Sequence, residues 1–143
     1  MRGEMDSKFL EQITEIAKYL AESAKKGKPA LSYQAVCDAM EAKGSKYKYG
    51  WRMLCRYLDA INDESKKIAS VYLSVLVVST GNKYKGKEMP GEKFFTNFAN
   101  IDPKDKKSCY DYFIKERDRV HKAASEGKLD PFINEKAFLG HQK

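Results

Sequence analysis

Apolar residues in the N-terminal part of the chain recur at the spacing of amphipathic helices. Asp6 or Ser7 is expected to cap a first helix, and Gly27 to follow its last turn. The apolar positions between them lie mostly three or four residues apart: Phe9, Ile13, Ile16, Ala17, Leu20 and Ala24. A second helix is predicted after Ser32 as its N-cap, with Gly44 at its end.

A third helix is predicted over residues 46–62, and its two sides differ sharply. One side is apolar, with Leu54, Leu58 and Ile61. The opposite side carries Arg52 and Arg56, whose spacing of four places both guanidinium groups on one face. Lys46 and Lys48 precede them, and no acidic residue occurs between Ala42 and Leu58. Three short helices joined by glycine-containing loops favour a helix-turn-helix core.

The pattern changes at Val71–Val78, a β-branched apolar run that predicts a strand. Gly81–Asn82 then opens a turn-rich segment that Pro90–Gly91 closes. This segment, residues 81–91, is basic, with Lys83, Lys85 and Lys87 around Gly86. It is expected to be a β-hairpin with a long basic tip, or a strand followed by an irregular loop. Beside a helix-turn-helix such a segment would be a wing, and the alternative is a solvated loop.

A long C-terminal helix is predicted from Asp102 as N-cap and Pro103 at the first helical position to Gly127. Its expected buried stripe is Cys109, Phe113, Val120 and Ala124. Residues 128–143 form a tail whose apolar side chains are expected to pack back on the domain, or else to dock on a partner. The predicted fold is therefore mainly α with a small β-hairpin: one winged-helix-like domain over residues 6–127, then the tail.

Composition narrows the class of partner. The 143 residues make about one domain and include 27 Lys and Arg against 20 Asp and Glu, a net charge of +7. That balance favours an acidic partner, such as DNA, RNA, an anionic membrane or an acidic protein. The longest apolar run is too short to span a bilayer, and the N-terminus lacks the pattern of a signal peptide. No membrane association is expected, and the oligomeric state is left open.

The cysteines favour a cytoplasmic protein, and the search for catalytic motifs favours a non-catalytic one. Cys37, Cys55 and Cys109 are widely spaced and odd in number, which indicates reduced thiols. Neither His121 nor His141 has zinc-ligand spacing with a cysteine. No nucleophile elbow or glycine-rich phosphate loop occurs. A metal at Asp59, Asp63 and Glu64 is a minor alternative, so no metal or cofactor is expected.

Four short motifs share their order with a known family. Ser32–Val36 reads Ser-Tyr-Gln-Ala-Val and resembles the (Ser/Thr)-Tyr-Gly-(Glu/Gln)-(Leu/Ile) helix opening of a winged-helix-like family found beside bacterial and phage restriction-type endonucleases. Arg52–Ile61 resembles that family's Arg-Ala-Ile-Gly-Arg-Val-Leu-Gly-Pro-Ile helix. Leu76–Gly81 and Pro90–Phe94 resemble its leucine-valine strand with Thr-Gly and its Pro-Gly with phenylalanine. The resemblance spans about Leu31 to Phe95.

The same pattern is similar to the DNA-binding half of alkylguanine-DNA alkyltransferases and alkyltransferase-like proteins. The resemblance implies that Tyr33 works at a DNA phosphate and that Arg52 enters the base stack. The reactive Pro-Cys-His-Arg motif is absent, and Leu73–Leu76 stands near its place, which excludes alkyl transfer. Gln34 and Cys55 replace family glycines, so a less close approach to DNA is expected at these two positions.

These observations predict a non-catalytic nucleic-acid-binding module, with double-stranded DNA ahead of RNA. Arg52 and Arg56 would contact bases or phosphates from the major groove. The backbone contacts would come from Tyr33, Lys46, Lys48, Lys83, Lys85 and Lys87.

The alternative is a protein-interaction module, such as a phage or mobile-element inhibitor of a host nucleic-acid-processing machine. A winged-helix scaffold can be reused in this way, because a fold does not determine a function. The surface would then be formed by tyrosines, a residue type favoured at contact centres: Tyr47, Tyr49, Tyr57, Tyr72 and Tyr84.

Overall fold

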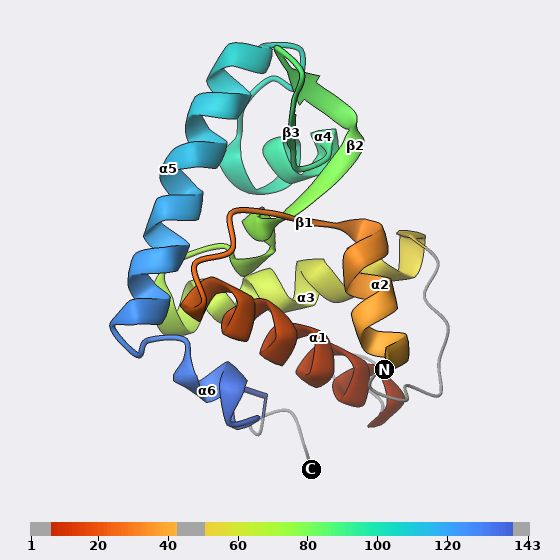
Figure 1. The fold of residues 1–143 in the computed structure, drawn as a ribbon, viewed down its shortest axis with the longest axis vertical. Helices are drawn as coiled ribbons and strands as arrows, with labels where there is room; N and C mark the ends of the chain where they lie inside the picture. The colour runs from red at the N-terminus through yellow and green to blue at the C-terminus, as the bar shows by residue number, and fades with distance from the viewer. Residues whose placement is uncertain (1–6, 43–50, 139–143) are drawn as a thin grey trace.

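A computed structural model describes residues 7–42 and 51–138 of the chain. The structure is mainly helical with a small three-stranded mixed sheet (Figure 1). The helices are α1 (Ser7–Lys25), α2 (Tyr33–Ala42), α3 (Trp51–Ala69), α4 (Glu92–Phe94), α5 (Lys106–Ser125) and α6 (Asp130–Ile133), with a 3-10 turn η1 (Leu73–Leu76) and a π-helical turn η2 (Phe95–Ala99). The strands are β1 (Leu31–Ser32), β2 (Val77–Tyr84) and β3 (Lys87–Met89).

The first helix ends where the sequence predicts. Ile13, Ile16 and Leu20 are fully buried on its inner side. After its last residue, Gly27 has a φ of +76°, and its N–H donates to the carbonyl of Ala24 at 2.9 Å. Only glycine adopts that backbone conformation without strain, so the local sequence is sufficient to end the helix here.

The predicted cap of α2 is also present. The Oγ of Ser32 accepts a hydrogen bond from the backbone N–H of Ala35 at 3.0 Å, which satisfies one free donor of the first helical turn. Ser32 also belongs to β1, which pairs in parallel with β2. The expected end of α2 at Gly44 lies outside the described residues.

The third helix continues seven residues past the predicted end at Asn62, to Ala69. Asn62 is fully buried, and its side chain donates to the Oγ of Ser74 at 2.7 Å and accepts from the N–H of Ser74 at 3.0 Å. An asparagine whose amide is satisfied by a tertiary partner does not compete with the helix backbone. The helix therefore runs through it.

The predicted strand over Val71–Val78 is wrong in its first part. Leu73–Leu76 forms the 3-10 turn η1, and β2 starts only at Val77. All six residues from Leu73 to Val78 are buried. A run that is buried on every side has no periodicity, so its residues alone do not distinguish a strand from a turn in the core.

The predicted hairpin is present, but its tip is short. β2 and β3 pair antiparallel, and Tyr84 and Lys87 flank a two-residue turn at Lys85–Gly86. Both turn residues have positive φ, +50° and +79°, as a twisted two-residue hairpin connection requires. Gly81–Asn82, expected to open a turn, lies inside β2, where the pairing register shifts between Ser79 and Lys83.

The long helix α5 starts later than predicted, at Lys106. Its N-cap is Asp105, which accepts from the N–H and hydroxyl of Ser108 at 3.2 and 2.8 Å. Asp102 instead accepts from the N–H of Lys104 at 3.0 Å and so closes a separate turn. Two aspartates three residues apart each offer a cap, and the second begins the helix.

The residues after α5 pack back on the domain, as the sequence predicts. Gly127, with a φ of +79°, ends the helix turn, and α6 then lies against α1 (Figure 1). Phe132 and Phe138 are buried, with ring centroids 5.8 Å apart. Two ion pairs join α1 to α6 and to the residues just after it: Lys25 with Asp130 at 3.2 Å and Lys18 with Glu135 at 2.9 Å.

Candidate nucleic-acid interface

The exposed side of α3 carries Arg56 outward, as predicted. Its side chain is exposed, while Leu54, Leu58 and Ile61 on the other side of the helix are buried. The guanidinium carbon lies 5.9 Å from the ring centroid of Phe9, which belongs to the first turn of α1. Such a cation–π contact supports the arginine side chain.

The other basic residues predicted around this helix are placed only in part. Arg52 is the second residue of α3, one turn before Arg56, so its backbone position falls on the same side of the helix. Lys46 and Lys48 lie outside the described residues. Further along the same side stand the exposed Asp59 and Asp63. Among the described side chains of this face, Arg56 is the basic one in the first two turns of α3.

The hairpin supplies a second basic surface. Lys83, Lys85 and Lys87 are all exposed on it. Two aromatic rings, Tyr84 and Tyr110, support Lys85 and Lys87, and their centroids are 5.8 Å apart. The Nζ of Lys85 lies 5.3 Å from the ring of Tyr84, and the Nζ of Lys87 lies 6.0 Å from the ring of Tyr110. Tyr110 belongs to α5, so this helix backs the hairpin.

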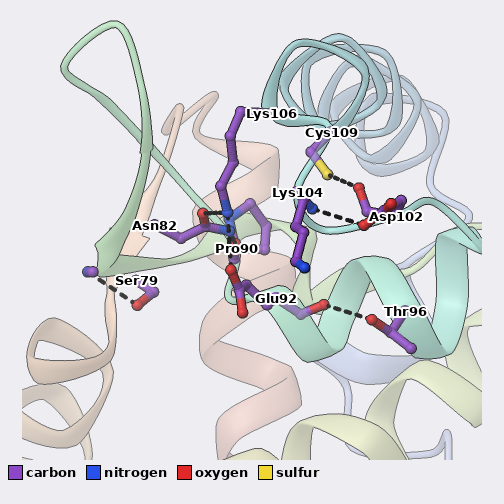
Figure 2. Close-up of polar contacts among 10 residues, drawn as sticks. Ser79, Asn82, Pro90, Glu92, Thr96, Asp102, Lys104, Lys106 and Cys109 are labelled. Carbon is purple, nitrogen blue, oxygen red and sulfur yellow. Dashed lines mark hydrogen bonds and ion pairs between the residues drawn. The ribbon is translucent and has the colours of Figure 1, made fainter.

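A polar clamp centred on the buried Asn82 holds the base of the hairpin (Figure 2). Asn82 is 4% exposed, and its Nδ2 donates to the carbonyl of Pro90 at 2.7 Å. Its Oδ1 accepts from the Nζ of Lys106 at 2.7 Å, and the same amine pairs with Glu92 at 3.0 Å. Lys106 thus joins α5 to both ends of the hairpin segment. The sequence alone gives no indication of this role, because one lysine in a lysine-rich helix start carries no distinguishing signal.

Tyr33 does not stand out on the basic surface; it reaches toward α3 and the turn at Gly91. Its side chain is half-buried, and its hydroxyl lies beside the thiol of Cys55. A Cβ placed on Gly91 would lie 3.6 Å from the same hydroxyl oxygen. Burial and then the neighbouring Cys55 raise the pKa of Tyr33 well above its usual value, so its phenol is neutral at physiological pH.

Between α3 and the hairpin base lies a cavity of about 330 Å³, which we name the Tyr33 pocket. Its apolar walls are Leu58, Val77, Pro90, Phe94 and Phe98. Its polar groups include the Tyr33 hydroxyl, the Cys55 thiol, Asp59 and Lys93. Burial raises the pKa of Asp59, the nearby Asp63 adds to the rise, and Lys93 opposes it.

The tyrosines expected to form a protein-binding surface are mostly packed against other rings. Tyr57 is buried, with its ring centroid 5.1 Å from that of Phe9. Tyr72 is half-buried, 5.1 Å from Phe98, and Tyr84 is half-buried against Tyr110. Tyr47 and Tyr49 lie outside the described residues. The three described tyrosines therefore serve packing inside the molecule.

The described part of the chain has neither a cluster of metal-ligating side chains nor a helix that could span a membrane. Across residues 7–42 and 51–138, no three His, Cys, Asp or Glu side chains gather as a metal site would require, Asp59, Asp63 and Glu64 included. Within those same ranges, every helix is too short or too polar to cross a bilayer.

No protein-family model, curated protein or solved structure matches this chain.

Proposed function

We propose that this protein is a non-catalytic module that binds double-stranded DNA in a winged-helix-like manner. The first two turns of α3 would enter the major groove, with Arg52 and Arg56 facing base edges or phosphates. The hairpin would lie along a phosphate strand as the wing, with Lys83, Lys85 and Lys87 as its contacts. The resemblance noted in the sequence agrees with this arrangement, because its motifs are those of α2, α3 and the hairpin.

The observation that carries the proposal is the outward Arg56 on a helix whose opposite side is fully buried. A helix in this position can be approached by a partner without disturbing the core, because Leu54 and Ile61 have no exposed surface to lose. The clamp at Asn82 supports the proposal further, since it holds a lysine-rich hairpin to the body of the protein. Because the hairpin is already anchored, little binding free energy is lost in ordering it when DNA binds.

The proposal is tested by fluorescence anisotropy with duplex and single-stranded DNA of random sequence between about 50 and 200 mM salt. The logarithm of the affinity should fall linearly with the logarithm of salt, with a slope of about −0.9 for each duplex phosphate contacted. Neutralising the wing with K83Q/K85Q/K87Q should make that slope shallower by about 0.9 for each of these lysines that binds a phosphate. Duplex DNA is expected to bind more tightly than single strands.

Charge reversal at Arg56 tests whether α3 itself contacts DNA or whether any exposed cation contributes equally to binding. Arg56→Glu should weaken duplex binding at least tenfold, because it places a carboxylate against the phosphates. The matched control is Lys26→Glu, an exposed cation that lies about 25 Å along α1 from Phe9 and hence from Arg56. Equal reductions in affinity from both variants would remove α3 from the interface. Absence of duplex binding, with a protein complex that persists in high salt, would favour the inhibitor function instead.

A further inference from the structure

We propose that the Tyr33 pocket is a binding site for an uncharged bicyclic aromatic molecule of mainly apolar character. The molecule would lie between Phe94 and Phe98 on one side and Leu58 and Val77 on the other, with one edge toward Tyr33 and Cys55. This inference does not depend on DNA binding, because it rests on the shape and chemistry of the cavity alone.

The size of the pocket selects a two-ring ligand. Its volume is about 330 Å³, within the range of natural ligand sites, which begins near 300 Å³. An engineered cavity of about 150 Å³ lined by Leu, Ile and Phe holds benzene, so roughly twice that volume admits a fused pair of rings. A single water or ion would leave most of the apolar wall uncovered.

The walls select a flat apolar ligand. Phe94 and Phe98 have ring centroids 5.7 Å apart and lie at 41° to each other, so they form a bent aromatic surface. Phe94 is held there by an edge-to-face contact with Phe95 at 5.4 Å, and Phe98 by Tyr72. Rings fixed by such contacts lose little conformational freedom when they stack on a ligand.

The charges around the pocket select a neutral ligand. Asp59 and Lys93 are of opposite sign and already interact, and the carboxylate of Glu92 is paired with Lys106 at 3.0 Å. An anion would be repelled by Asp59 and a cation by Lys93, whereas an uncharged ligand would be repelled by neither. The Tyr33 phenol and the Cys55 thiol, whose pKa values burial raises, remain neutral hydrogen-bonding groups for one edge of the ligand.

The chain carries its own reporter for occupancy of this pocket. Cys55 lines the pocket and Cys37 does not, although both are half-buried and burial raises the pKa of both thiols. The wild-type protein is treated with iodoacetamide at mildly alkaline pH, and labelling of each cysteine is followed by peptide mass spectrometry. Indole should slow the labelling of Cys55 in a saturable way and leave the rate at Cys37 unchanged.

Three probes that share one ring system test the charge argument. Indole, indole-3-carboxylate and tryptamine are uncharged, anionic and cationic at neutral pH, and their dissociation constants are read from the protection of Cys55. We expect indole to bind at least tenfold more tightly than either charged analogue. Adenosine, a polar bicyclic ring, is expected to bind more weakly than indole as well.

Two variants test the geometry. Phe98→Ala removes one aromatic wall and should weaken indole binding at least tenfold, whereas Phe9→Ala, which removes a half-buried ring outside the pocket, should leave it unchanged. Tyr33→Phe keeps the ring and removes only the hydroxyl, so it should weaken indole binding about two- to tenfold. This variant still tests the site if Phe98→Ala does not fold.

Three results would overturn the assignment. The first is labelling of Cys55 that indole does not slow up to its solubility limit. The second is binding of a charged analogue or of adenosine as tight as that of indole. The third is equal affinity in Phe98→Ala and Phe9→Ala. None of these readouts involves DNA, so failure here is distinct from failure of the proposed DNA binding.

Discussion

Arg56 and Asp59 stand nearly one turn apart on the exposed side of α3 and have opposite charges. Asp59 is exposed as a residue, but partial burial of its carboxyl beside the Tyr33 pocket raises the pKa, the repulsion from Asp63 adds to the rise, and Lys93 offsets part of it. The folded protein therefore favours the protonated form of this carboxyl more than the unfolded chain does. At the scale of the residue, ionisation of Asp59 therefore lowers the stability of the folded protein.

The Asp59→Asn variant should be more stable than the wild type at about pH 7. A carboxyl whose folded pKa is raised contributes stability below its ordinary value of 3.8, and that contribution is lost as the pH rises through the folded pKa. The advantage of the variant should therefore disappear at about pH 3, where Asp59 is protonated in both states. Urea unfolding at the two pH values measures this difference.

The exposed Asp118 of α5 offers a control for the change in net charge. Asp118→Asn removes the same charge from a different helix and does not alter the Tyr33 pocket. A wild type more stable than Asp59→Asn at about pH 7 would contradict the prediction and show that the attraction of Lys93 outweighs burial.

At the scale of the element, local signals account for the ends of α1 and the cap of α2. Gly27 and Ser32 act on the backbone within a few residues of themselves, so their effects can be predicted from the sequence. The hairpin depends on both local and distant groups. Gly86 permits its turn, but its attachment to the body requires Asn82 to meet Pro90 and Lys106.

Asn82→Ala should destabilise the protein by about 1–3 kcal/mol, because it leaves the buried carbonyl of Pro90 without its donor and removes one partner of Lys106. Amide hydrogen exchange in β2 and β3 should also become faster. Urea unfolding gives the change in free energy, and Asn97→Ala, at an exposed asparagine, should stay within about 0.5 kcal/mol of the wild type. Unchanged stability and exchange in Asn82→Ala would show that the clamp does not hold the hairpin.

At the scale of the whole molecule, the last described residues complete the core around α1. Leu129, Phe132 and Phe138 are buried, and α6 packs on α1 although more than a hundred residues separate them in the chain. The sequence pattern predicts a division of the chain at residue 127, with a tail beyond. The packing makes residues 129–138 part of the same core as α1.

Phe132→Ala should lower the free energy of unfolding by about 3–5 kcal/mol, because the side chain is 1% exposed and its removal leaves a cavity between α6 and α1. Ile133→Ala, at the adjacent half-buried position, is the matched comparison and should cost clearly less. Chemical denaturation followed by circular dichroism measures both. Equal, small decreases in stability would mean that α6 adds little to the core.

The sequence by itself determined most of the apolar side of α1, α3 and α5, where α1 ends and how α2 is capped, and it favoured a lysine-rich hairpin or loop over residues 81–91. These features depend on side-chain periodicity and on groups close together in the chain. Only the tertiary structure decided that α3 passes through Asn62, that Leu73–Leu76 turns rather than extends, and that Lys106 joins Asn82 to Glu92. Each of these depends on a buried polar group or apolar surface meeting a partner far along the chain, and no local pattern records which partner the fold will bring to it.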